Sequence, residues 1–285
     1  RARHASLIEE FHYPRHGAGM MWEAMAREIQ HRGGDLRLGT TVTRLEHNGR
    51  RVTGLEVNGA RMSMEGGVVS AMPLRETLLS LEPEPPLEVL AAARGLRYRG
   101  LLLVALVIPV RDLFPDNWIY VHVPQVQVAR ISSFRNFSPE MAPDPELSVV
   151  GLEYFCWPSE GLWDRPEEEL LALGEQELTA LGLLHGEGVR GGKVVRVPAA
   201  YPVYDPDYQE RLQVLRSYLA SLKNLQVIGR AGMHRYNNMD HSILTGLLAA
   251  RNLLGESHDL WRVNLEEEYH EEARTGEALS NQSGD

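Results

Sequence analysis

The spacing of apolar residues predicts a chain that alternates between helices and strands. Met21, Met25 and Ile29 recur every four residues after a glycine-rich stretch, which predicts a helix that Gly33 and Gly34 would end. The same helical period recurs in "RPEEELLALGEQELTALGLL" and around residues 209–222, and a further helix is expected near residues 86–94. A mixed α/β or α+β fold follows from this pattern.

Strand-like patterns occur in two regions of the chain, which differ in the turns and residue types that mark them. In residues 38–73, Asn48-Gly49 and Asn58-Gly59 are both two-residue hairpin signals between strand-like runs, so we expect a β-meander from about residue 38 and then a short buried strand ending at Ser70. Runs rich in β-branched and aromatic residues at 99–108, 117–124, 126–134 and 147–157 follow with little helix between them. They predict an antiparallel sheet with a helix on one face.

Composition narrows the classes of protein. The chain has 285 residues, 43 % hydrophobic and 24 % charged, as in ordinary soluble domains. A formal net charge of −10 argues against nucleic acid or an anionic membrane as partner. No apolar run approaches the ~20 residues of a membrane span. Cys156 is the only cysteine, so a reducing cytoplasm is the simplest location, and the acidic tail at 271–285 is expected to be flexible.

Two familiar motifs are present but in the wrong context. "GEGVRG" at residues 186–191 matches a dinucleotide-binding pattern, yet it follows a predicted helix and precedes a strand, so we interpret it as a turn. In "HGAGMMW", Trp22 stands where the third glycine would be.

His234 and His241 lack a third ligand at a customary spacing, so no metal site is predicted.

The segment "GRAGMHRYNNMDHSILTGLLAARNLLG" places a polar loop between an apolar strand and a helix. We expect the strand to end at Gly229 and the helix to run over residues 241–253, capped by Asn238 or Asp240. Its predicted inner face carries Ile243, Leu247 and Ala250. The N-terminal end of this helix carries partial positive charge and would suit an anion. The alternative is that the segment is only a well-capped core helix preceded by a polar loop.

This segment strongly resembles the C-terminal flavin-contacting segment of FAD-dependent oxidoreductases, in the superfamily of amine oxidases, protoporphyrinogen oxidases and UDP-galactopyranose mutases. "YPRHGAGMMWEAMAREIQHRGGDLRLGTTVTRLEHNGRRVTGLEV" resembles the central segment of the same superfamily, and the likeness extends over about residues 11–269. It implies the C-terminal part of a two-domain FAD-binding fold. Residues 1–80 and 198–270 would belong to the FAD domain, and residues 81–197 would form an antiparallel-sheet substrate domain.

The resemblance also implies roles for individual residues. FAD would be bound by residues at nine matching positions: Gly17, Gly19, Val42, Ser70, Gly229, Arg230, Asn238, Met239 and Asp240. Arg130, Tyr201, Tyr204 and Tyr236 are the candidates for binding a small-molecule substrate, with Arg130 facing the cavity; for Arg135 a solvated surface position is the plainer alternative. No residue is predicted to be catalytic by itself.

Three functions remain open at this point. The first is an FAD-dependent oxidoreductase that takes a hydride from a C–N or C–C bond. The second is a mutase that uses reduced flavin on a nucleotide sugar, and the third is a non-catalytic fragment or subunit. The superfamily's phosphate-binding glycine motif belongs to an N-terminal segment that this sequence lacks, and the chain reads as if cut from something longer. An upstream segment or a second chain would then complete the FAD domain.

Overall fold

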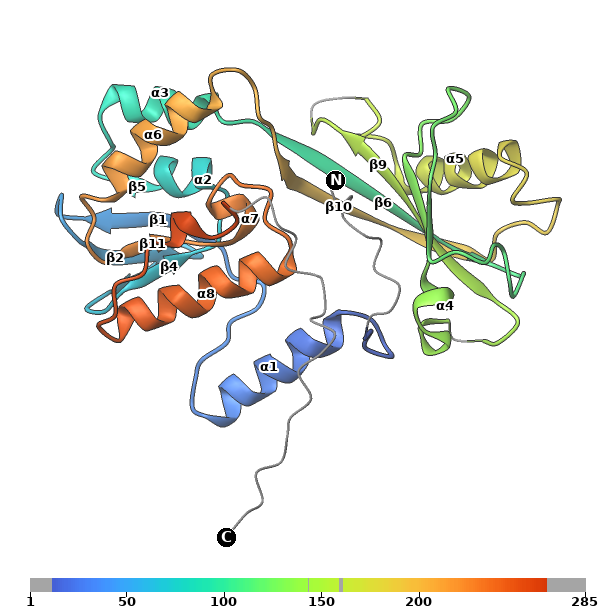
Figure 1. Ribbon diagram of the computed structural model, residues 1–285, viewed down its shortest axis with the longest axis horizontal. Helices are drawn as coiled ribbons and strands as arrows, with labels where there is room; N and C mark the ends of the chain where they lie inside the picture. The colour runs from blue at the N-terminus through green and yellow to red at the C-terminus, as the bar shows by residue number, and fades with distance from the viewer. Residues whose placement is uncertain (1–11, 143, 159–160, 266–285) are drawn as a thin grey trace, which may run out of the picture.

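Two bodies, each with its own cluster of buried apolar residues, make up the computed structural model (Figure 1). The structure describes residues 12–142, 144–158 and 161–265. We call residues 98–202 the middle body, and residues 42–97 with 203–265 the outer body, since the chain crosses between them at these points. The tail predicted at 271–285 lies outside the described residues.

The outer body begins with a four-stranded sheet in the order β3-β2-β1-β5. Its strands are β1 (Val42–His47), β2 (Val52–Val57), β3 (Ala60–Ser63) and β5 (Leu81–Glu82), with β5 parallel to β1 and the others antiparallel. Asn58 and Gly59 form the expected two-residue turn with φ of 49° and 79°. The Asn48-Gly49 turn is longer than expected, because Asn48 Oδ1 accepts bonds from the backbone N–H of Arg50 and Arg51.

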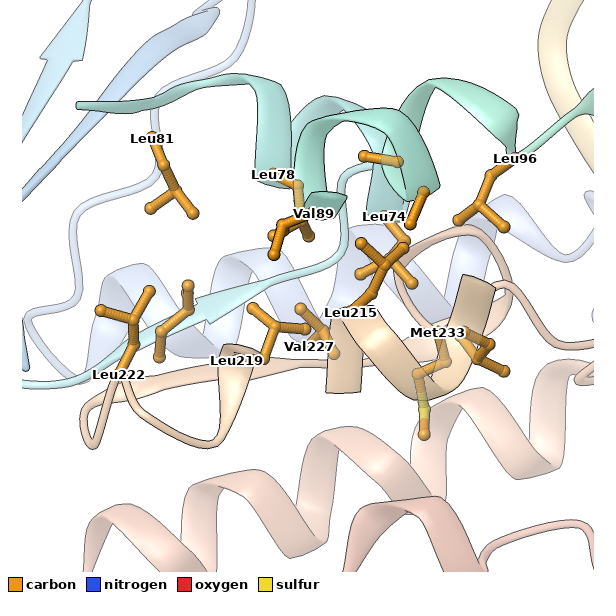
Figure 2. Packing of buried hydrophobic residues seen from close by; sticks show 14 of the residues in the cluster. Leu74, Leu78, Leu81, Val89, Leu96, Leu215, Leu219, Leu222, Val227 and Met233 are labelled. Carbon is orange, nitrogen blue, oxygen red and sulfur yellow. The ribbon is translucent and has the colours of Figure 1, made fainter. Parts of the chain in front are cut away.

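A two-stranded parallel sheet lies beside it, made of β4 (Val68–Ser70) and β11 (Leu225–Val227). One side carries α2 (Leu74–Leu79), α3 (Leu87–Gly95) and α6 (Tyr208–Leu219), and α8 (Met239–Leu253) lies on the other (Figure 1). Figure 2 shows Leu74, Val89 and Leu215 converging between these helices, where all three are buried. This packing is the apolar core of the outer body.

The middle body is an antiparallel five-stranded sheet in the order β10-β6-β9-β8-β7, as the sequence predicts. Its strands are β6 (Tyr98–Ile108), β7 (Trp118–Tyr120), β8 (Arg130–Ser133), β9 (Ser148–Cys156) and β10 (Gly191–Pro202). The helix α5 (Glu167–Ala180) covers one face. It approaches closely at Gly174, where an added Cβ would lie 3.1 Å from Leu106. The "GEGVRG" stretch lies between α5 and β10, where its last glycine, Gly191, begins β10, so a strand and not a helix follows it.

Three further helical segments lie after β8 or before β1. These are α4 (Phe134–Phe137), η1 (Pro139–Met141) and α1 (Gly19–His31). The helix predicted from Met21, Met25 and Ile29 is confirmed, but none of its residues is buried, and Met25 is 47 % exposed. Its apolar stripe therefore has no cover within the part of the chain that the structure describes.

The chain first crosses between the bodies at residues 97 and 98, and the domain limits implied by the resemblance stay a prediction. The strand β5 pairs with β1, and α3 packs in the outer core, so both belong to the outer body. Tyr98, the first residue of β6, accepts a bond from Leu74 N and donates to Ala231 O, both at 3.0 Å. The second crossing lies alongside the first, because Val203 N donates to Arg97 O at 3.0 Å. We therefore place the boundary at residues 97 and 98.

Two predictions around the polar loop were wrong in detail. The strand β11 ends at Val227, and Gly229 instead opens a single helical turn, α7 (Gly229–Gly232). In α8 the buried positions are Thr245 and Ala249, whereas Leu247 is 57 % exposed. The expected inner face was wrong because α8 packs on β11 with its small residues. Leu244, Leu247 and Leu253 are exposed, whereas Leu248 packs against the outer core.

Candidate functional site

The start of α8 is built by hydrogen bonds within the polar loop. Asn238 caps the helix in a reciprocal capping box with His241. Arg230 Nε donates to Asn237 O at 2.7 Å, and an Nη of Arg230 donates to Asn238 Oδ1 at 3.2 Å. Gly229 N donates to Thr245 Oγ1 at 3.0 Å. The loop is thus fastened to the helix that follows it, and the cap already binds one first-turn N–H group of the helix, that of His241.

Arg230 also joins this loop to two tyrosine rings. Its guanidinium lies 4.4 Å from the centre of the Tyr236 ring and 5.3 Å from that of Tyr201. The two rings stack with their centres 5.9 Å apart. A guanidinium over aromatic faces is held by the ring quadrupoles, so this group is fixed without a carboxylate.

The middle body contributes a buried ion pair to the same place. Arg130 on β8 donates to both carboxylate oxygens of Glu153 on β9, at 2.9 and 2.7 Å. The two residues are directly opposite in the β8–β9 register. An arginine on an apolar strand needs an anion or water, and Glu153 supplies the anion here. The contact of Arg130 with a substrate stays a prediction.

Tyr201 links the ion pair to the loop. Its ring meets Phe155 edge to face, with centres 5.3 Å apart. Burial raises the pKa of the Tyr201 hydroxyl, and the charges of Glu153 and Tyr236 raise it further. The hydroxyl is therefore neutral near pH 7 and can donate a hydrogen bond. A continuous row results, which we call the inter-body row: Arg130, Glu153, Phe155, Tyr201, Tyr236 and Arg230.

Tyr204 is placed apart from the other two tyrosines. Its hydroxyl accepts a bond from Tyr236 N at 2.6 Å, and its ring stacks on Tyr208 at 4.4 Å. It lines a cavity of about 830 Å³ between α6 and β11. Tyr204 therefore holds the Tyr236 backbone in place through this hydrogen bond. The predicted contact of Tyr204 with a substrate stays a prediction.

The remaining predicted cofactor residues lie in four places. Ser70 is next to Gly229, since Ile228 N donates to Ser70 O at 2.9 Å, but its hydroxyl is engaged with Thr77 at 2.9 Å. Val42 opens β1. Gly17 and Gly19 lie at the start of α1, where an added Cβ on Gly17 would come 3.2 Å from Met141 in η1. Met239 and Asp240 form the exposed first turn of α8.

Sequence reasoning missed two parts of this arrangement. Glu153 and Phe155 were not singled out, because alternation in β9 marks them only as one face of a strand. Arg135 is 9 % exposed and so is not the solvated surface residue that was the plainer alternative. Glu153 could have been found only as the cross-strand partner of Arg130, and strand register cannot be read from a single sequence.

The fit to a flavin can be tested on the backbone at Gly229. This residue has φ of +76°, and no heavy atom lies within 4 Å of the Cβ that another residue would carry there. A side chain at this position would therefore enter open space beside the loop. The positive end of α8, the Arg230 guanidinium and an open glycine fit a group with electron-rich oxygens. Among the described residues, no three His, Cys, Asp or Glu side chains gather as a metal site.

Comparisons with known proteins agree with this geometry. A family model described as flavin containing amine oxidoreductase matches residues 4–254. Reduced UDP-galactopyranose mutase matches with a TM-score of 0.74 at 19 % identity, over 89 % of this chain and 55 % of that one. A candidate protoporphyrinogen oxidase from Exiguobacterium sp. has a TM-score of 0.64 at 15 % identity, over 84 % and 51 %.

A redesigned putrescine oxidase has a TM-score of 0.57 at 15 % identity, over 85 % of this chain and 53 % of that one. The search of curated proteins gives no match. At these identities the solved structures show a shared fold, and the chain spans about half of their length. The family and these neighbours imply FAD as the cofactor. With its model matching most of the sequence, the chain belongs to the family of flavin-containing amine oxidoreductases.

Proposed function

We propose that this chain is the substrate-facing and C-terminal part of an FAD-dependent oxidoreductase that transfers a hydride from a small organic molecule to flavin. The observation that supports this most is the inter-body row. It runs without a break from a sheet that can hold a substrate to the loop in front of α8. A substrate lying along the row would touch residues of both bodies.

On the cofactor side, the chain would supply fixed positive potential. The α8 N-terminus and Arg230 would lie against the oxygen-rich edge of the flavin, where they stabilise negative charge. Both are set before any ligand arrives, because Arg230 is held by Asn237 and Asn238 and by the two tyrosine rings. Preorganised charge of this kind lowers an energy barrier without a cost of reorientation.

On the substrate side, the row would orient the molecule and exclude water. The bound flavin supplies the hydride-accepting chemistry. The neutral Tyr201 hydroxyl can donate to a substrate oxygen or nitrogen. Arg130 keeps N–H groups beyond those that Glu153 and Tyr120 use. Phe155 and Tyr236 offer ring faces that would shield the reacting bond from water.

The FAD domain would be completed by a further segment, from the same polypeptide or from a second chain. The strand β11 is paired with β4 alone among the described residues. The cavity of about 830 Å³ lies along β11, and its lining includes Leu212 and Leu219 of α6. An added strand at this edge would find backbone partners and an apolar cover, as an exposed edge requires. The same segment would bring the phosphate-binding glycines that this chain lacks.

The isomerase alternative, with reduced flavin acting on a nucleotide sugar, rests on a likeness of folds to UDP-galactopyranose mutase. Fold alone does not assign a reaction. The third alternative, a subunit without activity of its own, describes this chain in isolation. It is compatible with an oxidoreductase once the partner segment is bound.

The proposal is tested by preparing the chain alone and together with an N-terminal flavin-binding segment encoded upstream or in a separate gene. Alone, the chain is expected to be colourless and to associate through its open strand edge. Together, the proteins should show flavin absorbance near ~450 nm, a property of the cofactor. Anaerobic mixing with a panel of amines and unsaturated ring compounds should bleach that band. A complete protein that binds no flavin would overturn the proposal.

A further inference from the structure

A buried histidine lies against both points where the chain crosses between the two bodies. His234, which follows α7, is 1 % exposed, and its Nε2 lies 3.3 Å from Val203 O at the second crossing. Its ring meets the ring of Tyr98, the first residue of β6, edge to face with centres 4.8 Å apart. Ala231 O accepts from the Tyr98 hydroxyl at 3.0 Å and from His234 N at 3.3 Å. One residue therefore contacts the chain where it enters the middle body and where it leaves.

The surroundings of the His234 ring set its protonation state. Val203 O is a carbonyl oxygen and can only accept, so Nε2 carries the hydrogen. In the neutral ring Nδ1 then has a lone pair and no hydrogen. This atom is buried and has no hydrogen-bond partner among the residues that the structure describes. Burial lowers the pKa of His234, although Val203 O and the charge of Asp205 act to raise it, so the ring is neutral near pH 7.

A second proton on the ring would be poorly compensated. The titratable and charged groups around the ring and the cavity beside it are Tyr98 of β6, Tyr204 and Asp205 after β10, Tyr208 and Arg216 of α6, and Arg235. Asp205 is the carboxylate whose charge acts on the ring, and it already binds Arg211 at 2.7 and 2.9 Å. A charged imidazole here would thus be buried without a counter-ion, which costs free energy unless the ring moves toward water.

Tyr204 connects His234 to the candidate site. Its ring meets the His234 ring with centres 6.3 Å apart, and its hydroxyl accepts from Tyr236 N at 2.6 Å. Tyr236 in turn stacks on Tyr201 and lies 4.4 Å from the Arg230 guanidinium. Movement of the His234 ring would therefore free Tyr204 and, through it, the backbone that places the Tyr236 ring in the inter-body row.

We propose that His234 is a pH-sensitive switch between the two bodies: the neutral ring holds the crossings and the Tyr236 loop together, and the protonated ring releases them. The switch needs no cofactor, so it stands apart from the proposed function. In the released state the ring is exposed and binds a proton near pH 6.5. The loop is therefore held above about pH 6.5, and the released state gains about tenfold at pH 5.5, since each pH unit below the pKa of the free ring favours it by up to ten.

Native-state hydrogen exchange on this chain, between about pH 7.5 and pH 5.5, tests the switch. After correction for the chemical exchange rate at each pH, the opening constant of the Tyr236 amide should rise by about tenfold on acidification. This opening should change little with low concentrations of denaturant, because a local opening exposes little surface. Amides of β6 and β9 should exchange through openings that respond steeply to denaturant, as global unfolding does.

Two variants separate His234 from other titrating groups. His234→Phe keeps a ring but cannot take a proton, so its opening constant at Tyr236 should stay the same over this pH range. His122→Phe is the matched control at an exposed histidine, and it should keep the rise of the parent protein. The thermal midpoint shows whether His234→Phe is folded. If it is not, His234→Asn replaces it, because asparagine tolerates the φ of +47° at this position.

Three results would overturn the inference. The first is a parent protein whose Tyr236 opening does not rise on acidification, and the second is a rise that persists in the His234 variant. The third is a Tyr236 opening that responds to denaturant as steeply as the amides of β6, which would mean that His234 affects only global stability. None of these measurements depends on flavin content, so their outcome is separate from that of the proposed function.

Discussion

Tyr201 and Tyr236 stack at 5.9 Å with their ring planes 24° apart, although one ends β10 and the other precedes α8. The stack joins the middle body to the outer body beside the Arg230 guanidinium. Aromatic pairs with offset or tilted rings contribute stability beyond their buried area. The position of the middle body relative to the outer body is therefore set in part by side chains of the inter-body row.

The first prediction concerns the open glycine in front of α8. Gly229→Ala should reduce the flavin content of the complete protein severalfold, because a methyl group would enter the space proposed for the cofactor. Gly255→Ala is the control, since Gly255 also has a positive φ, of +102°, and open space around its Cβ. Both variants carry the same kind of backbone strain. Equal flavin loss in the two would show that strain, and not the cofactor, explains the effect.

The second prediction concerns the ion pair. Glu153→Ala should lower the free energy of unfolding of this chain by about 2–4 kcal/mol, because it leaves the Arg130 charge half-buried without a partner. Combining Glu153→Leu with Arg130→Met should recover most of that loss, since an apolar pair needs no compensation. Denaturant titrations measure both. Glu167→Ala, which breaks an exposed pair with Lys193, should change stability little.

A third prediction follows from Tyr98, whose hydroxyl bridges Leu74 N and Ala231 O. Tyr98→Phe leaves that buried N–H and that carbonyl without a partner, so a loss of about 1–3 kcal/mol in unfolding free energy is expected. Tyr218→Phe is the matched control on α6, at a half-buried tyrosine. A small loss of unfolding free energy for Tyr98→Phe, close to that of the control, would contradict this role. The hydroxyl would then not stabilise the point where the chain crosses between the bodies.

The fourth prediction concerns pH. His234 is 1 % exposed, and burial lowers the pKa of its imidazole, although Val203 O and Asp205 act to raise it. The unfolded chain then binds a proton near pH 6.5 while the folded chain does not, so stability is full above that pH and falls as pH drops toward the folded pKa.

His234→Phe should flatten the stability of the chain between about pH 7 and pH 5, relative to the parent protein. The ring would keep its contacts with Tyr98 and Tyr204. Denaturant titrations at several pH values provide the measurement, and His122→Phe, at an exposed histidine, is the comparison. The same pH slope in His234→Phe and in the parent would contradict the assignment.

Local signals in the sequence were sufficient for most elements. The Asn58-Gly59 turn was predicted because both residues tolerate a positive φ, and the helix at Met21 was predicted from its period. The α2 helix and β5 were missed because each is six residues or fewer, too short to show a period. The outward face of α8 was misassigned because apolar residues occur on more than one side of it.

The candidate site was predictable only in part. The polar loop was recognised from Gly229 and its neighbours, since glycine and helix-capping residues leave a local signature. The pairing of Arg130 with Glu153, and the meeting of Tyr201 with Tyr236, depend on register and on contacts between distant segments. Neither leaves a trace in the spacing of residues along the chain.

The hydrogen bond from Val203 N to Arg97 O has a consequence for how this architecture can change. Because the two crossings are neighbours, the whole middle body enters and leaves the outer body at one point. Such a segment behaves as an insertion with adjacent ends, and insertions of that kind are well tolerated. The middle body can thus be replaced as one unit with two neighbouring junctions, while the outer body keeps its own packing.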